Sequence, residues 1–368
     1  MSLTVVEISL PALRHNLQEV SRLVRAGIIL AVVKANAYGH GAVPVSQALL
    51  VAGASRLGVA TVTEGIELRQ AGITAPILVM GGGVADEFQA LLQYQLTPVV
   101  PSRDCLVSLA QMASKGSSRL PVHLKIDTGM GRLGLSSTEA RSVFDSGWPS
   151  ALRLEGLMSH LASADDMDAQ ATEAQLGQFR TVLEDIKRRG IELPLAHIAS
   201  SAGILRFPAS HFDLVRPGLM LYGYAPGALI STNLRPVLTW KTQVIQVKRV
   251  SPGEAVSYGG TFIAKRPTTL AILAVGYADG YSRAFSNRGR VLLQGRMVPV
   301  VGRVCMDLTI VDVTDIPLVV PGAEAVLIGR QGSGGISAND LAAQIDTISY
   351  EILTSIGPRV QRVYKETD

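Results

Sequence analysis

The sequence predicts an α/β protein, with a (β/α)8 TIM-like barrel over residues 1–231 and a mainly β C-terminal domain over residues 232–368. Two observations predict this architecture. Up to about residue 230, eight short apolar runs alternate with amphipathic or turn-like stretches. Beyond that point strand-like runs follow one another, separated by turns rich in Pro and Gly. An open, doubly wound parallel sheet is the alternative, because a count of strands does not show whether a sheet closes.

The eight runs of the first part are rich in leucine or β-branched residues and mostly lack polar–apolar alternation. This is typical of strands that are buried on both faces. We expect these strands over residues 28–33, 57–60, 77–80, 96–100, 122–126, 154–159, 195–199 and 213–216. In the second part we expect strands over residues 237–250, 269–275, 290–293, 297–301, 308–313 and 325–328, and one convincing helix over residues 338–345.

Helix signals lie between the runs of the first part. Thr61 and Glu64 have the spacing of a capping box, and Ser136 and Glu139 repeat it. The longest candidate helix covers residues 170–189, followed by Gly190 at a position suited to a C-terminal cap.

The composition excludes several classes of protein. Apolar residues make up 47% and charged residues 17%, which excludes a disordered acidic chain. The 34 basic and 30 acidic side chains are interleaved and aromatic residues are only 5%, so a nucleic-acid-binding face is not expected. The histidines lack metal-ligand spacing and no G-x-S-x-G is present, so we expect neither a metal site nor the commonest serine hydrolase.

The location is predicted from three further features. No apolar run reaches the roughly 18 residues that span a bilayer. The N-terminal stretch contains Glu7 and has neither a basic flank nor a small-residue cleavage site, unlike a signal peptide. Cys105 and Cys305 are far apart and form no C-x-x-C pair, so a disulfide framework is not expected. These features predict a cytoplasmic protein.

Polar residues follow several of the predicted barrel strands, where the active sites of such barrels gather. Lys34 is the most unusual of them, because it directly follows seven residues without charge or strong polarity. Desolvation there would lower its pKa and make the neutral amine a usable nucleophile. A lysine neutralised by a carboxylate is the alternative. The other strand-end residues are Arg132, His160, Ser200, Ser201 and Arg216.

Gly129, Gly131 and Gly134 formally match a dinucleotide-binding fingerprint. The match comes midway through the series of strands and lacks a suitable acid about 20 residues downstream. The loop is better suited to presenting Arg132, which can bind a carboxylate through two parallel hydrogen bonds.

Several segments together resemble the alanine racemase family, whose barrel-type members depend on pyridoxal 5′-phosphate (PLP). The cofactor-lysine segment AVVKANAYGHG lies at residues 31–41. The other matches are KIDTGMGRLG at 125–134, VRPG at 215–218, VSYG at 256–259, VGYADG at 275–280 and VCMD at 304–307. The resemblance covers nearly the whole chain and implies a barrel followed by a β domain. It also implies a homodimer that interconverts L- and D-alanine and supplies D-alanine for peptidoglycan.

The resemblance implies two catalytic bases. Lys34 would hold PLP as a Schiff base and act as one base, and Tyr258 of the partner subunit would act as the other. His160 would link Tyr258 to Arg216 by hydrogen bonds. Arg216 cannot accept a proton, so the pyridine nitrogen would stay unprotonated. This favours quick reprotonation of the substrate over transamination.

The resemblance also implies the binding residues. The phosphate would be held by Tyr38, Ser201, Tyr350 and the backbone N–H groups of Gly218 and Leu219. The substrate carboxylate would be held by Arg132 and the backbone of Met306. Three residues would support the site, namely Lys125, Tyr277 and Asp307.

Two details within this resemblance stay open. In some members the lysine equivalent to Lys125 is carbamylated and pairs with the arginine, a role that Asp127 could fill instead. Ser200 stands where many members have Asn, which leaves one contact to the cofactor unassigned.

Three other functions are alternatives. A decarboxylase of basic amino acids from the same superfamily would carry a glutamate in place of Arg216 and a cysteine–acid motif in the β domain. A broader-specificity racemase acting on serine or lysine would usually have a signal peptide and a disulfide. A non-catalytic PLP-binding protein would lack residues 232–368 and with them Tyr258.

Overall fold

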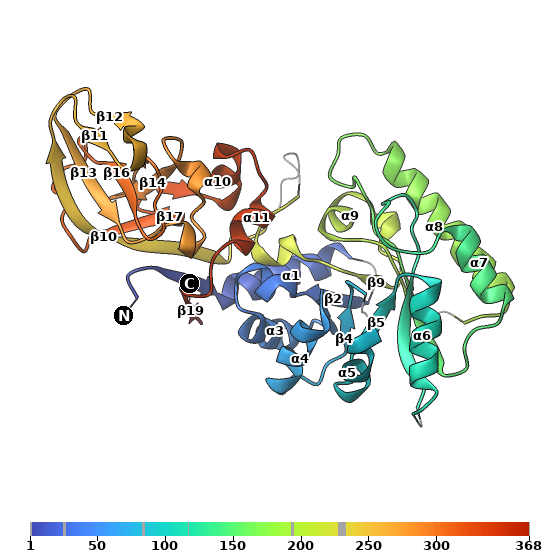
Figure 1. The fold of residues 1–368 in the computed structure, drawn as a ribbon. Coiled ribbons are helices and arrows are strands. Elements are labelled where there is room, and N and C mark those ends of the chain that lie inside the picture. Colours follow the sequence, from blue (N-terminus) through green and yellow to red (C-terminus); the bar gives the residue numbers. More distant parts are fainter. Residues whose placement is uncertain are drawn as a thin grey trace. The chain divides into compact units, whose positions relative to one another are not determined.

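A computed structural model describes residues 2–24, 27–82, 85–116, 118–192, 195–226 and 233–367 (Figure 1). The chain forms two compact units. The barrel unit comprises residues 13–37 and 42–235, and the β unit comprises residues 1–12, 38–41 and 236–368. The domain boundary predicted between residues 231 and 232 lies outside the described residues.

The barrel unit contains a sheet of eight strands, all pairs parallel, within the described part of the chain. The spatial order is β8-β7-β6-β5-β4-β3-β2-β9, so nearly every strand pairs with the next one in sequence. This order confirms the barrel prediction and excludes a doubly wound sheet, in which the strand order reverses. The strands are β2 (Ile28–Val32), β3 (Arg56–Val59), β4 (Ile77–Val79), β5 (Thr97–Val100), β6 (Leu120–Lys125), β7 (Leu152–Met158), β8 (Leu195–His197) and β9 (Leu214–Val215).

The ring closes between β8 and β9 through a short seam. Ser200 and Arg216 form one parallel bridge, and the backbone N–H of Arg216 donates to Ala199 O at 3.0 Å. A second backbone bond joins Asp213 N–H to Ala196 O at 3.1 Å. The seam is therefore a few bonds rather than a full ladder.

Two helices of this unit begin at the capping boxes that the sequence predicts. Thr61 and Glu64 form a capping box at the start of α4, and Ser136 and Glu139 form another at the start of α7. Gly190 follows the longest helix in the left-handed conformation that favours glycine. The helices are α2 (Lys34–Tyr38), α3 (Ala42–Val51), α4 (Val62–Gln70), α5 (Phe88–Gln93), α6 (Arg103–Ala113), α7 (Ser137–Asp145), α8 (Gln170–Arg188) and α9 (Ser201–Arg206), after the N-terminal α1 (Leu10–Leu23).

The β unit is built on a nine-stranded sheet whose main path is β15-β14-β17-β10-β1-β19. Strands β13 and β16 extend it from β10, and β18 pairs with β17. The long β10 (Leu238–Val250) is its centre, because it pairs with β1, β13 and β17. The other strands are β1 (Val5–Ser9), β13 (Thr268–Leu273), β14 (Arg290–Leu293), β15 (Arg296–Pro299), β16 (Thr309–Asp312), β17 (Glu324–Gln331), β18 (Gly334–Ile336) and β19 (Gln361–Lys365).

All six strands predicted for this part are present within a few residues, and the predicted helix is α10 (Ala338–Gln344). The structure also contains elements that the sequence pattern did not predict: β1, β18, β19, the short pair β11 (Ala255–Val256) and β12 (Phe262–Ile263), and a second helix, α11 (Ser349–Thr354). Strand β1 pairs antiparallel with β10 and parallel with β19, so both ends of the chain enter this sheet.

None of the helices in the described residues is both long enough and apolar enough to cross a bilayer. Cys105 and Cys305 are both free thiols. Where the chain is described, no three His, Cys, Asp or Glu side chains gather as metal ligands.

Candidate active site

Lys34 lies two residues after the end of the barrel strand β2 and begins a left-handed backbone turn. Ala35, Asn36 and Ala37 have φ values of 52°, 52° and 53°, which is the left-handed region. For residues other than glycine this conformation costs roughly 1–2 kcal/mol each. The amine therefore sits on strained backbone that the surrounding structure must hold in place.

Specific hydrogen bonds hold this turn. The backbone N–H of Ala35 donates to Glu64 Oε1 at 2.6 Å, and that of Ala37 donates to Val33 O at 2.8 Å. The side-chain carbonyl of Asn36 accepts from Ala42 N–H at 2.8 Å. Glu64 also accepts from the backbone N–H of Ala60 at 2.7 Å, so one carboxylate joins the start of α4 to the lysine turn.

We expect Glu64→Ala to lower the free energy of unfolding by about 2–3 kcal/mol, since hydrogen bonds to a charged group contribute about 1.5–3 kcal/mol. The reactivity of the Lys34 amine should fall with it, because the turn that carries the lysine loses a hydrogen-bond acceptor. Glu67→Ala, at an exposed position of the same helix, is the matched control and should change little. Urea denaturation of the three proteins measures this. Equal stabilities of the two variants would contradict the assignment.

The pKa of the Lys34 amine is lowered, first by partial desolvation and then by the positive charges of Arg132 and Arg216. Glu64 acts in the opposite direction. The side chain nevertheless remains exposed to solvent, so a small molecule can reach it. A larger fraction of this amine is therefore neutral and nucleophilic than for an ordinary exposed lysine, and it lies at an accessible position.

Arg216 is buried, with 3% of its surface exposed, and both of its terminal nitrogens are engaged. Nη1 donates to His197 Nδ1 at 2.7 Å. Nη2 donates to the backbone oxygens of Ser159 and Ile198 at 2.7 and 3.0 Å, and to His160 Nδ1 at 3.2 Å. Burial lowers the pKa of the guanidinium to about 9, so it stays cationic at neutral pH. Nε has no partner among the described residues and is left to donate to a ligand.

His160 thus lies within hydrogen-bond distance of Arg216, whereas its further link to Tyr258 stays a prediction. His160 Nδ1 must accept in this bond, because a guanidinium only donates. The proton of the neutral ring then lies on Nε2. Burial, and then Arg216 and other cations, lower the pKa of His160 well below its ordinary value, so the ring is neutral.

Ser201 lies at the first turn of α9 and organises the predicted phosphate region. Its hydroxyl oxygen accepts from the backbone N–H groups of Gly218 and Met220 at 3.0 and 3.3 Å. The hydroxyl proton is left to donate to an anion. The N–H of Gly218 is engaged by Ser201, whereas that of Leu219 has no hydrogen-bond partner in the described part of the chain.

Lys125, at the end of β6, is buried, and its side-chain amine has no hydrogen-bond partner among the described residues. Burial, and then Arg216 and Arg132, lower the pKa of this amine to about 7. Asp127 does not pair with Arg132, because its carboxylate accepts from the backbone N–H groups of Gly129, Met130 and Gly131 at 2.8–3.2 Å. Although burial opposes it, these N–H groups lower the pKa of Asp127.

We therefore expect Lys125, rather than Asp127, to provide the negative partner of Arg132 by reacting with carbon dioxide. The reaction joins the neutral amine nitrogen to carbon and releases one proton, so the adduct should form as the pH rises through about 7. Carbon-13 NMR with labelled bicarbonate should show one slowly exchanging carbamate signal. Lys125→Met should remove the signal, and the exposed Lys115→Met should keep it. A signal that survives in Lys125→Met would refute this expectation.

In the β unit, Tyr38 and Tyr350 lie with ring centroids 6.0 Å apart and planes inclined by 45°. Burial is the main cause that raises the pKa of the Tyr38 phenol, which therefore stays protonated and able to donate. The two predicted phosphate-side tyrosines of this unit are thus neighbours.

Tyr258 lies in the short turn η4 (Tyr258–Gly260) with 71% of its surface exposed. The preceding Ser257 has φ 65° and donates from its hydroxyl to Arg303 O at 2.7 Å, which ties the turn to the segment before Met306. Tyr277 and Met306 are also exposed, and their segments are joined by Tyr277 N–H to Cys305 O and Ala278 N–H to Met306 O, both at 3.0 Å.

Asp307 does not stand alone in this cluster. Arg359 donates to Asp307 at 2.8 Å and to both carboxylate oxygens of Asp279 at 2.6 and 3.0 Å. The segments 276–280 and 304–307, which resemble family motifs, are thus brought together. The backbone N–H of Met306 has no partner among the described residues and is left for a ligand, as its predicted role requires.

Sequence reasoning missed residues that support the site. Glu64 was noted only as a helix cap, and His123 and His197 were not noted at all. The two histidines lie in short strands whose other residues are mostly apolar. This was the available signal, because a buried polar side chain needs a partner.

These features define a class of protein, a barrel enzyme that carries an accessible amine of lowered pKa beside cationic groups at its strand ends. The residues of the barrel unit fit PLP: Lys34 for the aldehyde, the Arg216 Nε–H for the ring nitrogen, and Ser201 with the Leu219 N–H for the phosphate.

Comparisons with known proteins agree with a barrel enzyme whose residues fit PLP. The family model "Alanine racemase, N-terminal domain" matches residues 8–226, and "Alanine racemase, C-terminal domain" matches residues 237–364. An alanine racemase of Halothermothrix orenii is 45% identical and covers 98% of this chain and 97% of its own. The chain belongs to the alanine racemase family, and is thus a PLP-dependent isomerase.

Solved structures show the same similarity. That of an alanine racemase from Streptomyces lavendulae has a TM-score of 0.95 at 35% identity, covering 99% of this chain and 97% of its own. That of an alanine racemase from Bartonella henselae, with covalently bound pyridoxal phosphate, has a TM-score of 0.92 at 31% identity, covering 99% and 100%.

Proposed function

We propose that this isomerase interconverts L- and D-alanine as a homodimer, using Lys34 and the partner subunit's Tyr258 as its two bases, and that it supplies D-alanine for peptidoglycan in the cytoplasm. The observation that carries the proposal is the Lys34 amine, accessible on a strained turn and lowered in pKa beside Arg132 and Arg216. Family membership supports the choice of substrate.

Racemisation removes a proton from one face of Cα and returns it on the other, so two groups of opposite position are needed. When bound, PLP withdraws electrons from the amino acid and so acidifies Cα–H. Lys34 moves a proton at Nζ on one face, and the phenol oxygen of Tyr258 does so on the other. The exposed Arg132 binds the substrate carboxylate, together with the backbone N–H of Met306.

Arg216 orients the cofactor and selects the reaction. Its Nη1 and Nη2 are held by protein acceptors, so its Nε–H would point to the ring nitrogen. A guanidinium can only donate hydrogen bonds, so the ring nitrogen would accept one and would itself carry no proton. The residue therefore favours return of the proton to Cα over transfer elsewhere.

Three large side chains that are exposed on the β unit support the proposal of a dimer. Tyr258, Tyr277 and Met306 are 71%, 42% and 54% exposed. Aromatic residues and methionine are enriched at protein interfaces, and large exposed apolar side chains that gather together mark such surfaces. A second copy of the chain would cover these side chains and receive Tyr258.

Chiral chromatography of alanine, serine and lysine, each incubated with the holoenzyme, tests the function. We expect alanine to racemise from either enantiomer, with serine and lysine at least about tenfold slower, the discrimination that small differences in side-chain fit provide. Comparable rates for lysine or serine would instead support the broader-specificity racemase. No racemisation of alanine would refute the proposal.

A further inference from the structure

Beyond the residues that face the cofactor, a row of buried polar side chains runs through the barrel away from Arg216. Its members come from different strands: His197 from β8, His123 from β6 and Glu155 from β7. His123 and His197 are 1% and 0% exposed, and Glu155 is 7% exposed. Polar groups buried this deeply are costly unless each one has a partner.

Two hydrogen bonds and one longer contact connect these side chains in a row, which we call the histidine chain. Arg216 Nη1 lies 2.7 Å from His197 Nδ1, and His197 Nε2 lies 2.7 Å from His123 Nδ1. The two imidazole rings meet edge to face, with centroids 4.9 Å apart. His123 Nε2 lies 3.9 Å from Glu155 Oε1, longer than a hydrogen bond, and has no closer acceptor among the described residues.

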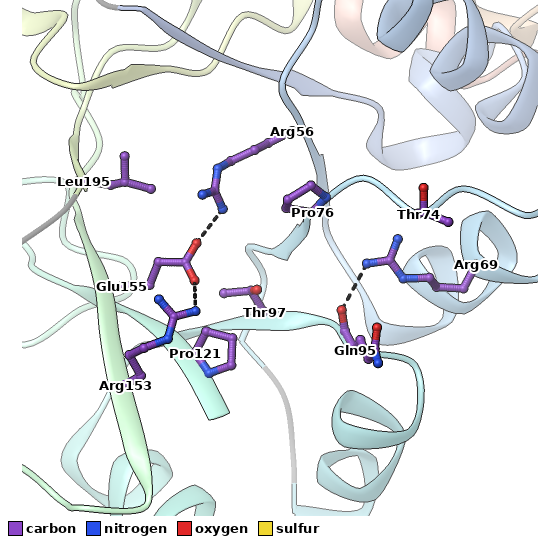
Figure 2. Close-up of a pocket in the computed structure, with 10 residues that line it drawn as sticks. All are labelled: Arg56, Arg69, Thr74, Pro76, Gln95, Thr97, Pro121, Arg153, Glu155 and Leu195. Carbon is purple, nitrogen blue, oxygen red and sulfur yellow. Dashed lines mark hydrogen bonds and ion pairs between the residues drawn. The ribbon is translucent and has the colours of Figure 1, made fainter. Parts of the chain in front are cut away.

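The last member of this row of side chains, Glu155, lies toward the opposite end of the barrel from Lys34. Glu155 is held between Arg56 Nη1 at 2.5 Å and Arg153 Nη2 at 2.8 Å (Figure 2). These residues line a cavity of about 460 Å³ near the first residues of β3, β5 and β8, whereas Lys34 and Arg216 follow the last residues of their strands.

The direction of every hydrogen bond in this chain is fixed by chemistry. Arg216 can only donate, so His197 Nδ1 accepts and the proton of neutral His197 lies on Nε2. His197 then donates to His123 Nδ1, which leaves the proton of neutral His123 on Nε2, facing Glu155. Burial is the main cause that lowers the pKa of both histidines, which agrees with two neutral rings.

Glu155 is suited to set this direction. His123, and then Arg56, lower the pKa of its carboxyl to about 2, although burial opposes them, so it is ionised and can only accept. Gly156, next to Glu155, leaves room for the His123 ring. A Cβ at this position would lie 2.5 Å from His123 Nδ1, so a side chain there would displace the ring.

We infer that Glu155 and His123 are positioning residues that act through His197 to hold the Arg216 guanidinium in the orientation that presents its Nε–H to the cofactor. An ionised acceptor at one end of the barrel thereby fixes a donor at the other. The inference rests on the proposed role of Arg216. If these hydrogen bonds had the opposite direction, His197 Nδ1 would carry a proton. Two donors, His197 Nδ1–H and Arg216 Nη1–H, would then face each other.

The first test is the tautomer of His197 in the holoenzyme, measured by nitrogen-15 NMR of its ring. We expect the proton on Nε2 in the wild type. Glu155→Gln, which can donate toward His123, should shift His197 toward the Nδ1–H tautomer. A proton on Nδ1 in the wild type would overturn the inference, whether or not the protein racemises alanine.

The second test is kinetic. Glu155→Gln should lower kcat about tenfold, as loss of an outer partner of a histidine commonly does, with KM for alanine changed little because Arg132 is untouched. The fraction of bound cofactor that loses its absorbance through transamination should rise. Arg153→Gln is the matched control, because it removes the ion pair at Glu155 Oε2 and leaves in place Oε1, which faces His123. It should keep the wild-type tautomer and kcat.

If Glu155→Gln does not fold, two variants of His123 decide the question with the same readouts. His123→Asn keeps an acceptor at the place of Nδ1 and should retain most of kcat and the wild-type tautomer. His123→Leu removes the acceptor and should lose both. Equal kcat and equal His197 tautomers in these two folded variants would overturn the inference, because a structural role would move stability alone.

Discussion

Lys34→Ala should lower the racemisation rate by about a thousandfold or more, since a positioned general base contributes about 10²–10⁴ and the same amine also anchors the cofactor. The rest of the fold should survive, because the side chain is exposed and makes no ion pair among the described residues. The change therefore separates chemistry from stability. Chiral analysis of alanine measures the rate, and thermal unfolding of the cofactor-free protein measures the fold.

Borohydride reduction identifies the amine independently. Treatment of the wild-type holoenzyme, followed by peptide mapping, should place the pyridoxyl group on Lys34. Lys125, the other lysine of lowered pKa, should stay unlabelled because it is buried. A label on Lys125, or none on Lys34, would refute the central assignment of the active site.

Tyr258→Phe should lower the rate by about 10²–10⁴, because only the phenol oxygen that moves the second proton is lost. Cofactor absorbance should be retained, and proton removal from L-alanine should be impaired more than from D-alanine. Tyr94→Phe, in the barrel unit, is the matched control. The measurement is loss of deuterium from Cα of each labelled enantiomer. A wild-type rate in Tyr258→Phe would exclude the two-base assignment.

Mixing the two inactive variants tests whether Tyr258 works across subunits. A mixed dimer of Lys34→Ala and Tyr258→Phe chains contains one site with both bases intact if Tyr258 acts in the partner's site, and none if it acts in its own. After subunit exchange in equal amounts, we expect about a quarter of the wild-type activity, for a dimer with two equivalent sites. No recovery despite exchange would show that the site is completed within one chain.

The sequence predicted the barrel well because its signals are local. Each predicted strand is a run of apolar residues, and Thr61 and Ser136 mark helix starts with a glutamate three residues on. β1 and β19 were missed because their pairing joins the two ends of the chain. Five half-buried residues carry little signal of such a partner. Helix α11 was missed because six residues show less than two turns of periodicity.

The candidate site residues were predicted from residue type and resemblance. The contacts that hold them in place were not predicted. Ala35 and Ala37 disfavour a left-handed turn and only Asn36 tolerates one readily. The contact that holds this conformation comes from Glu64, 29 residues from Ala35. Likewise, Asp127 could serve as a partner of Arg132 in the sequence, and only the folded loop shows its oxygens bound to backbone N–H groups. The roles of Lys34, Tyr258 and the binding residues stay predictions until the variants are measured.

The short seam between β8 and β9 couples ligand occupancy to the integrity of the ring. Arg216 and Ser200 form its bridge, and Ser201 follows immediately, so the residues assigned to the cofactor also close the strand circle. A molecule bound by Arg216 on one side and Ser201 on the other would add bonds across the weakest junction of the wall. Holoenzyme and apoprotein would then differ most in local unfolding at this junction. When vitamin B6 is scarce, the cofactor-free enzyme would unfold locally at the junction between β8 and β9 first.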